Sequence, residues 1–590
     1  MTGPCRVLAG PGSGKTHVMI RRILYLITNA DVPPSQILAV TFSRAAALQM
    51  QQRFYSLCLC PVSFSTLHAL CYQILREESG CRCSVIGGAE KSALLRHLAA
   101  DCCSAEEQNV PDLIGELAFY LSRQKESGQI PPYLPVSEKA FRGVRDGYDR
   151  WMRENGKIDF SDMITDAAHL LKERPGILAK WQKRFSFFLV DEFQDLSDLQ
   201  YELIRRLSAH TDNLFVVGDD DQSIYAFRGA SPSVLQRFAQ DYPDCRDVHL
   251  IINYRCAEKI RRAADRVIRE NRARIPKKSR AYREGGQIEL QGFVSEKEEL
   301  AFLAAQLKKL SPAQLEQTAV IVRTRVLRDY FLRSLGEEGI ACRGASRDRS
   351  GVGTEVIGDI KAYFRFAAAC VQGGARQDFY RIMNRPERYL TRDLAPEEAV
   401  TEASVLRHAG SRTETVRMAR ELFRDLKALR QMKPGSGLKY LMNTMGYRKY
   451  LQETGAKNSR ELLSERMAEE LMRAAAACSG PEQFVRYLDR AESLPQQPEL
   501  PETEDRGVSV LTMHASKGLE YDRVFLPELN EGIIPGRRTA SSQEGEEEER
   551  RLFYVAMTRA RKELNLYYIS GTPQNPRAVS RFLLPLISLK

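Results

Sequence analysis

The chain has 590 residues, which exceeds one hydrophobic core and predicts about four structural units. Lysine and arginine outnumber aspartate and glutamate by 87 to 76, and the resulting net charge of +11 favours a polyanionic partner modestly. No signal peptide and no apolar run of membrane-spanning length occur, so we expect a cytoplasmic protein with no membrane partner.

The 13 cysteines have no metal-ligand spacing. Cys58, Cys60, Cys81 and Cys83 form C-x-C rather than C-x-x-C pairs, and no matching histidine pair accompanies them. Reduced thiols are therefore the favoured interpretation, and an iron–sulfur cluster is the less favoured alternative.

A glycine-rich loop lies near the start of the chain. Cys5–Ala9 is predicted to be a strand, and an apolar-periodic helix begins near Val18. Between them the sequence reads Ala9-Gly10-Pro11-Gly12-Ser13-Gly14-Lys15-Thr16. This context is typical of a phosphate-binding loop, in which backbone N–H groups surround the phosphates, Lys15 reaches the β and γ oxygens, and Thr16 binds Mg²⁺. Ala9 replaces the usual first glycine.

A second candidate for the same site is the acidic end of an apolar run. Residues 187–190 read Phe-Phe-Leu-Val, as expected for a parallel strand buried on both faces, and Asp191 and Glu192 follow. The first acid can hold Mg²⁺ and the second can accept a proton from an attacking water. A strand ending in a solvated acidic turn explains this stretch alone equally well; the phosphate loop favours the catalytic interpretation.

Two further strand ends carry aromatic and basic residues. Strands are predicted at Ile37–Phe42 and near Ser63–His68, with Arg44 just after the first. Phe42, Arg44 and His68 could line a groove for single-stranded nucleic acid, where an aromatic ring stacks on any base. Core packing would explain Phe42 about as well.

The loop after the predicted strand Leu214–Gly218 combines two functions. Gln222 could detect the γ-phosphate through the attacking water, and Tyr225 and Phe227 are candidate platforms for base stacking. Because all three lie in one loop, hydrolysis could be coupled to movement on a strand.

A second α/β unit is predicted to begin at residues 251–255. Further strands are expected at Gln287–Phe293, Ala319–Arg323, Val508–Thr512 and Val524–Leu526. Tyr254 could stack on adenine, and Arg255 and Arg559 are candidate arginine fingers. For an isolated arginine a surface salt bridge would be the simpler explanation.

Helical, charged composition interrupts each α/β unit. The predicted fold class is therefore α/β, with two parallel-sheet units, each carrying a mainly helical insertion. The predicted division is residues 1–86 with 185–250, a helical insertion at 87–184, residues 251–374 with 507–590, and a second helical insertion at 375–506.

The order of motifs resembles the UvrD/Rep/PcrA group of superfamily 1 DNA helicases over nearly the whole chain. The stretches that carry the resemblance are residues 9–16, Val-Asp-Glu-Phe-Gln-Asp at 190–195, Gly-Asp-Asp-Asp-Gln-Ser-Ile-Tyr at 218–225, Asn-Tyr-Arg at 253–255, His-Ala-Ser-Lys-Gly-Leu-Glu at 514–520 and Thr-Arg-Ala at 558–560. Six ordered motifs make the resemblance very specific.

The resemblance implies two motor domains of the RecA-like, phosphate-loop NTPase type that close on ATP and step 3′ to 5′ along single-stranded DNA. It implies that Lys15, Thr16 and Asp191 serve phosphate and Mg²⁺, that Glu192 is the general base and that Gln222 detects the γ-phosphate. It further implies transition-state stabilisation by Arg255 and Arg559, adenine stacking by Tyr254, ribose contact by Glu520, and DNA contact by Phe42, Arg44, His68, Tyr225, Phe227 and His514.

Several positions depart from the family pattern around the nucleotide. Only Met1–Pro4 precede the first strand, where the family has about twenty residues, including a glutamine that reads adenine; a start placed upstream or relaxed adenine reading is expected. His17 replaces the arginine that follows Lys-Thr, and Phe227 replaces a tryptophan of the DNA platform.

Other departures concern duplex DNA. Residues 388–391, Arg-Tyr-Leu-Thr, replace a Gly-Ile-Gly turn that grips the duplex, and residues 570–576 are a trimmed version of the strand-separating hairpin. The family's C-terminal tail does not follow.

The sequence therefore predicts an ATP- and Mg²⁺-dependent 3′ to 5′ DNA helicase of repair or recombination. Its expected partners are single-stranded DNA and single-strand/duplex junctions, and its expected state is a monomer or weak dimer. One alternative is a translocase that strips proteins from single strands and opens duplexes poorly. A binding module that uses ATP only as a clamp is disfavoured by the intact motifs, and a nuclease fusion is set aside because no acidic cluster follows Arg559.

Overall fold

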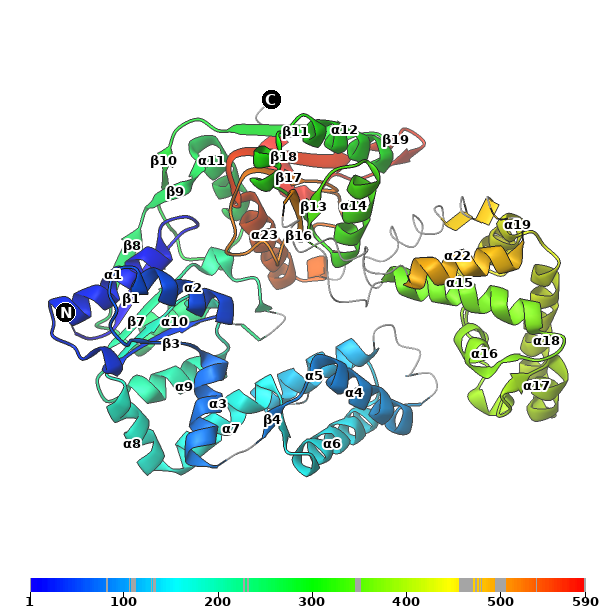
Figure 1. Ribbon diagram of the computed structural model, residues 1–590, viewed down its shortest axis with the longest axis horizontal. Helices are drawn as coiled ribbons and strands as arrows, with labels where there is room; N and C mark the ends of the chain where they lie inside the picture. The colour runs from blue at the N-terminus through cyan, green and yellow to red at the C-terminus, as the bar shows by residue number, and fades with distance from the viewer. Residues whose placement is uncertain are drawn as a thin grey trace.

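The chain forms two parallel six-stranded sheets, one at the left and one at the upper middle of Figure 1. The computed structural model describes residues 2–80, 83–104, 107, 113–128, 130, 134–226, 229–230, 233–344, 352–455, 471–472, 475–476, 478, 480–493, 506–536 and 539–587. The predicted α/β fold class with two parallel-sheet domains is confirmed.

The first sheet has the order β3-β2-β6-β7-β1-β8, and every pair of neighbours is parallel. Its strands are β1 (Cys5–Ala9), β2 (Ile37–Thr41), β3 (Ser63–Thr66), β6 (Phe187–Val190), β7 (Leu214–Gly218) and β8 (Arg246–Leu250). The five predicted strands are confirmed. The edge strand β8 was not predicted, because its mostly exposed residues lack the apolar run of a central strand.

Amphipathic helices cover this sheet. They are α1 (Lys15–Thr28), α2 (Arg44–Tyr55), α3 (Leu67–Glu78), α9 (Asp198–Ser208) and α10 (Val234–Asp241). The hydroxyls of Ser43 and Thr66 accept hydrogen bonds from backbone N–H groups at the starts of α2 and α3. These caps fix where each strand-end loop stops, and so where Phe42 and His68 lie.

The first helical insertion has its own core. It contains α4 (Gly88–Cys102), α5 (Leu113–Ser127), α6 (Glu138–Glu154), α7 (Phe160–Glu173) and α8 (Pro175–Arg184). Leu95, Leu117, Phe141 and Tyr148 are buried together. Residues of α7 share the core of the first sheet with α3, which attaches the insertion to that sheet.

The second sheet has the order β11-β18-β17-β12-β16-β13 and is also parallel. Its strands are β11 (Gln287–Phe293), β12 (Thr318–Val322), β13 (Cys342–Arg343), β16 (Val508–Thr512), β17 (Tyr521–Leu526) and β18 (Ala560–Ile569). The long strand β18 was not predicted, because its charged first residues hide the apolar run behind them. β9 (Ile252–Ala257) lies outside this sheet and pairs with β10 (Arg280–Arg283).

Helices α11 (Glu258–Ile268), α12 (Glu296–Lys308), α14 (Arg325–Glu337) and α23 (Gln543–Met557) pack on the second sheet. Ile260 and Ala264 of α11 lie with Phe553 of α23 in one core.

The second insertion is the helical body at the right of Figure 1. It contains α15 (Val352–Ala369), α16 (Arg376–Ile382), α17 (Glu402–Ala409), α18 (Thr413–Arg430) and α22 (Pro481–Ser493). One core runs from Val356 to Leu488, so α15, which the sequence assigned to the second motor domain, packs with the insertion instead. We propose that this boundary lies before α15 rather than at residue 375; the other domain limits stay as predicted.

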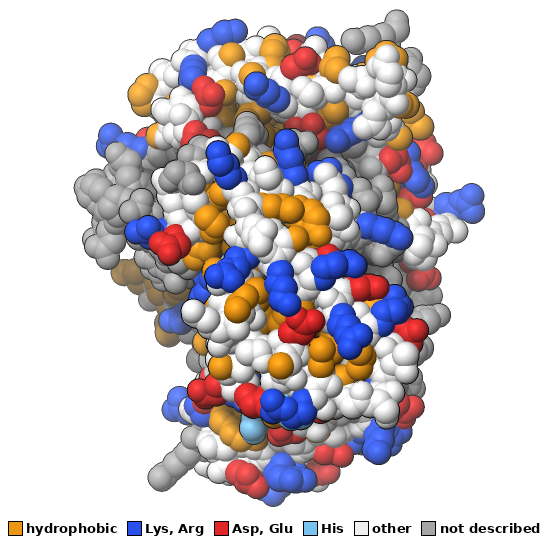
Figure 2. All heavy atoms as spheres, turned by 90° about the vertical axis from the view of Figure 1, so that its right-hand side faces the viewer, with side chains coloured by type: hydrophobic (Ala, Val, Ile, Leu, Met, Phe, Trp, Pro, Cys, Tyr) orange, Lys and Arg blue, Asp and Glu red, His pale blue; other side chains and the backbone are white. Residues whose placement is uncertain are grey.

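Charged side chains of both signs are mixed on the surface, in keeping with the modest net charge of the chain. On the face of the second insertion, basic side chains alternate with acidic and apolar ones rather than forming a field of one sign (Figure 2). Across the described ranges, no helix has the length and apolar character needed to span a membrane. The cysteines of these ranges are free thiols.

Candidate active site and nucleic-acid interface

The phosphate loop joins β1 to α1 as predicted. Gly12 and Gly14 have φ angles of 66° and 88°, which L-residues with a Cβ rarely adopt. The Ser13 hydroxyl donates to the Gly10 carbonyl at 2.7 Å and closes the turn. Lys15 and Thr16 are consequently the first residues of α1, where helix N–H groups can bind an anion.

Glu192 and Lys15 meet across the carboxyl end of the sheet. The backbone of Glu192 has a φ of 49°, an uncommon value for a residue other than glycine. Its Oε2 lies 3.0 Å from Lys15 Nζ. Burial opposes ionisation of this carboxyl group, but the Lys15 ammonium lowers its pKa to about 2. The predicted general base is therefore a carboxylate beside the phosphate loop.

Asp191 offers a carboxylate oxygen as a ligand for a divalent cation. Its Oδ1 accepts a hydrogen bond from the Glu192 N–H at 2.9 Å. Burial and the neighbouring Glu192 carboxylate raise the pKa of Asp191, and a cation beside it would favour its ionised form. A carboxylate and the Thr16 hydroxyl are hard oxygen ligands, so both residues fit Mg²⁺.

Gln222 lies in a hydrogen-bonded network that sequence reasoning largely missed. Its side-chain amide donates to Asp219 Oδ2 at 2.5 Å. The Asp219 N–H donates to Gln194 Oε1 at 2.9 Å, and Gln194 Nε2 donates to Glu192 at 2.5 Å. The predicted γ-phosphate detector and the predicted base are thus joined. The position of Gln194 in the Val-Asp-Glu-Phe-Gln-Asp motif was the available signal.

Lys517 of the second domain reaches into the same network. Its ammonium donates to the Gln222 carbonyl at 2.8 Å, forms an ion pair with Asp195 and lies 4.0 Å from Glu192. The sequence placed Lys517 in a motif without assigning it a role. The network shows that the motif brings a positive charge to the first domain's acidic residues.

The Asn-Tyr-Arg motif lies directly on the phosphate loop. The Tyr254 N–H donates to the Gly12 carbonyl at 2.9 Å. A Cβ on Gly12 would lie 2.4 Å from the Cβ of Arg255, so only glycine permits this approach. The Tyr254 ring is 48% exposed and available for a base. Tyr282, which the sequence did not single out, lies 5.3 Å from it, ring centroid to ring centroid.

The two candidate arginine fingers lie in different environments. Arg255 Nε donates to Glu520 at 2.7 Å, and Glu520 also accepts from Arg561. Burial opposes ionisation of Glu520, yet these two arginines lower its pKa to about 2. Arg559 is buried and donates to the carbonyls of Val555 and Leu519 at 2.8 and 3.1 Å. The predicted roles of Arg255, Arg559 and Glu520 remain predictions.

His17 is exposed at the start of α1, where Arg21 Nε donates to its ring at 3.5 Å. This contact brings a guanidinium within one helical turn of the position where the family pattern has arginine.

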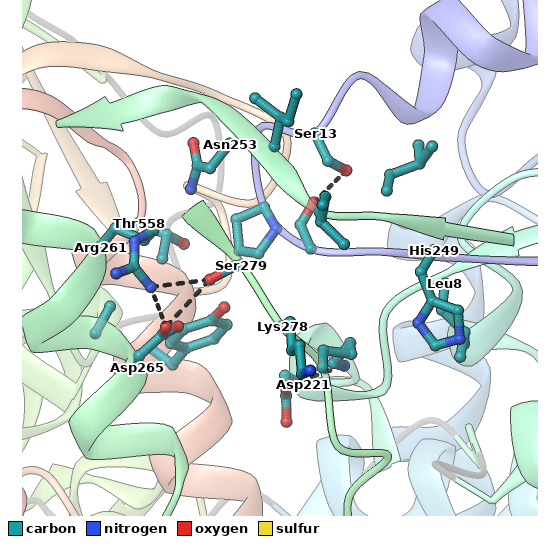
Figure 3. A pocket seen from close by; sticks show the side chains of 18 of the residues that line it. Leu8, Ser13, Asp221, His249, Asn253, Arg261, Asp265, Lys278, Ser279 and Thr558 are labelled. Carbon is teal, nitrogen blue, oxygen red and sulfur yellow. Dashed lines mark hydrogen bonds and ion pairs between the residues drawn. The ribbon is translucent and has the colours of Figure 1, made fainter. Parts of the chain in front are cut away.

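A narrow cavity of about 30 Å³ lies behind the phosphate loop, and both motor domains line it (Figure 3). Ser13 and Leu8 come from the first domain, and Asn253 and Thr558 come from the second. The volume is enough for a water molecule. The interface between the domains is therefore closely packed at this point.

Three of the predicted DNA residues, Phe42, Tyr225 and His514, form an aromatic row across the two domains. Phe42 and Tyr225 stack with ring centroids 4.9 Å apart, and the His514 ring lies 6.4 Å from Tyr225. Lys517 Nζ lies 5.0 Å from the Tyr225 ring centre. Phe227 lies outside the described residues. The row has one member, His514, from the second domain, so movement between the domains would change it.

Arg44 and His68 do not join this row. Arg44 is exposed at the first turn of α2. The rings of His68 and Phe160 are perpendicular with their centroids 5.6 Å apart, and burial lowers the pKa of His68. Phe160, which is 62% exposed, was missed by sequence reasoning, because as the first residue of α7 it belongs to no aromatic pattern.

The two duplex-related departures are visible in the fold. Arg388 is buried and donates to the Pro386 carbonyl at 3.1 Å, which makes it structural, whereas Tyr389 is 77% exposed with a φ of 54°. The candidate hairpin consists of two-residue strands, β19 (Gly571–Thr572) and β20 (Asn575–Pro576).

Comparison with known proteins decides the family. The model of the UvrD/REP helicase N-terminal domain matches residues 1–243, and that of the UvrD-like helicase C-terminal domain matches residues 248–395 and 443–571. The chain belongs to the UvrD/REP helicase family. The resemblance predicted from six motifs is confirmed, as is the expected enzyme class, a helicase.

Similar proteins align over nearly the whole chain. ATP-dependent DNA helicase Rep of Buchnera aphidicola is 30% identical over 99% of this chain and 94% of its own length. ATP-dependent DNA helicase PcrA of Leuconostoc citreum is 30% identical over 96% of this chain and 80% of its own. YjcD of Bacillus subtilis is 29% identical over 99% and 79%. The UvrD/REP family assignment thus covers both sheets and both insertions.

Proposed function

We propose that this protein is an ATP- and Mg²⁺-dependent DNA helicase that moves 3′ to 5′ along single-stranded DNA in repair or recombination. The observation that carries the proposal is the contact between the two motor domains at the phosphate loop, where the Tyr254 N–H donates to the Gly12 carbonyl at 2.9 Å. A nucleotide bound there would touch both domains, so its binding and hydrolysis would change their relative position.

The chemistry follows from the residues around that contact. Lys15 would turn from Glu192 to the β and γ oxygens of ATP, which frees the Glu192 carboxylate to take a proton from the attacking water. Mg²⁺, held by Thr16 and Asp191, would neutralise charge on those phosphates. Gln222 would orient the water, with its amide already held by Asp219.

The aromatic row supports the DNA part of the proposal. Phe42 and Tyr225 stack on each other, and a base that enters between or beside them would replace one ring contact with another. Base–aromatic stacking contributes roughly 1–3 kcal/mol per base and tolerates any sequence. The partners we propose are accordingly single-stranded DNA and single-strand/duplex junctions, with the protein acting as a monomer or weak dimer.

A second candidate is a translocase that displaces proteins with little unwinding. The short hairpin favours it, because strands of two residues each (β19 and β20) offer few side chains to separate base pairs.

One experiment tests direction and separates the candidates. Duplexes with a 3′ or a 5′ single-stranded tail, each carrying streptavidin on the tailed strand, are incubated with protein, ATP and Mg²⁺. We expect strand separation from the 3′-tailed substrate alone. Streptavidin release without strand separation would favour the translocase, and activity confined to the 5′-tailed substrate would contradict the proposed polarity.

A further inference from the structure

Three consecutive aspartates follow β7, and the chemistry above uses only the hydrogen bonds of Asp219 to Gln222 and Gln194. Asp219, Asp220 and Asp221 are 0%, 2% and 1% exposed, and one carboxylate oxygen of each lies within 4.8 Å of the other two. Buried like charges at this distance would destabilise the fold strongly unless cations compensate them.

The compensating cations come from the other motor domain. Lys277 donates to Asp219 Oδ1 and Asp220 Oδ1, and its Nζ lies 3.0 Å from Asp221 Oδ2. Arg274 binds Asp221 through two hydrogen bonds of 3.0 and 2.7 Å. Both side chains are nearly buried, at 10% and 15% exposure. The aspartates of the first domain are thus held by a segment of the second.

That segment, residues 269–279, is fixed to its own domain by α23. The Glu547 carboxylate accepts hydrogen bonds from the N–H groups of Arg272 and Ala273 at 3.0 and 3.3 Å. The Asn271 side chain donates to the Glu547 carbonyl at 2.9 Å. A movement of α23 would therefore be passed to Lys277.

Asp219 connects Lys277 to the catalytic network. One of its oxygens, Oδ1, accepts from Lys277, and the other, Oδ2, accepts from Gln222 Nε2. We propose that Lys277 is a positioning residue that orients the Gln222 amide through Asp219, so that the placement of the second motor domain controls hydrolysis. This inference rests on the proposed function, to which it adds a contact between the motor domains that regulates ATP hydrolysis.

A purely structural role would also require Lys277, so the test must keep the cluster balanced. The cluster holds three carboxylates and two cations; Lys277→Met with Asp220→Asn leaves two carboxylates and one cation, with the same net charge of −1. Lys309→Met is the matched control, because Lys309 is an exposed lysine on the same motor domain and lies outside this cluster.

We measure ATP affinity, thermal unfolding and kcat with saturating single-stranded DNA for each variant. For the balanced pair we expect kcat to fall by roughly 10- to 100-fold, since misplacement by about 1 Å can cost that much. The Kd for ATP should stay within about threefold and the control should match the unaltered chain. Adding Gln222→Ala to the pair should cost little more, because residues that act as a unit are not additive.

Glu547→Ala provides a second variant that loosens the segment without changing the cluster, and it should also lower kcat at unchanged ATP affinity. The proposed role of Lys277 is contradicted if the Lys277→Met/Asp220→Asn variant, or Glu547→Ala, folds and keeps the kcat of the unaltered chain. It is also contradicted if the kcat losses caused by the Gln222 and Lys277 substitutions multiply. An unaltered chain that shows no DNA-stimulated ATP hydrolysis would instead contradict the proposed function, and with it the proposed role of Lys277.

Discussion

Glu192→Gln is expected to slow DNA-stimulated ATP hydrolysis by roughly two to four orders of magnitude while ATP binding is retained. The amide cannot take a proton from the attacking water. The substitution is nearly isosteric, and its carbonyl oxygen can still accept from Lys15 and Gln194, which lie 3.0 and 2.5 Å from the present carboxylate. Steady-state hydrolysis and binding of a fluorescent ATP analogue measure the two properties separately.

Glu414→Gln is the matched control, since Glu414 is 78% exposed on its side chain and lies in the second insertion. It should behave like the unaltered chain. Near-normal turnover of the Glu192 variant would mean that another group activates the water, and the assignment of the base would be wrong.

Lys15→Met should lower kcat by about two to three orders of magnitude, as loss of one preorganised charge donor does in other active sites. It should also weaken ATP binding, because Lys15 is the group at the first turn of α1 that can reach the phosphates. The same substitution should raise the pKa of Glu192, since the Lys15 ammonium contributes most to lowering it.

Lys562→Met is the matched control, because it removes an equal charge from an exposed position, where Lys562 pairs with Asp522. It should leave kcat and the Kd for ATP unchanged. Tight ATP binding and rapid hydrolysis by the Lys15 variant would place the phosphates elsewhere in the molecule.

The sequence predicted those parts of the fold that local pattern specifies. Buried parallel strands such as β6 are unbroken apolar runs, and the phosphate loop has a glycine wherever the backbone needs a positive φ. The edge strand β8 and the charged start of β18 lack such runs, because β8 is mostly exposed to solvent and the start of β18 carries ion pairs. Pattern alone could not reveal them.

In the candidate site too, only the contacts that follow from local motifs could be predicted. Motif order predicted that Lys15 and Glu192 would meet, because parallel strands deliver their loops to one edge of a sheet. It could not predict the contacts that Lys517 and Lys277 make with the acidic residues of the first domain. These partners are far away along the chain, and the contacts depend on how the two domains pack. Nor could motif order predict that α15 packs with the insertion, since an apolar helix face does not by itself specify the core that it joins.

The most direct test of the account is ATP hydrolysis by the unaltered chain with and without a single-stranded DNA oligonucleotide. A DNA-coupled motor predicts a steep rise in kcat on adding DNA, because the aromatic row and the catalytic network share the loop that carries Gln222 and Tyr225. Hydrolysis that is low and unchanged by DNA would contradict the central claim and favour a nucleotide-dependent clamp.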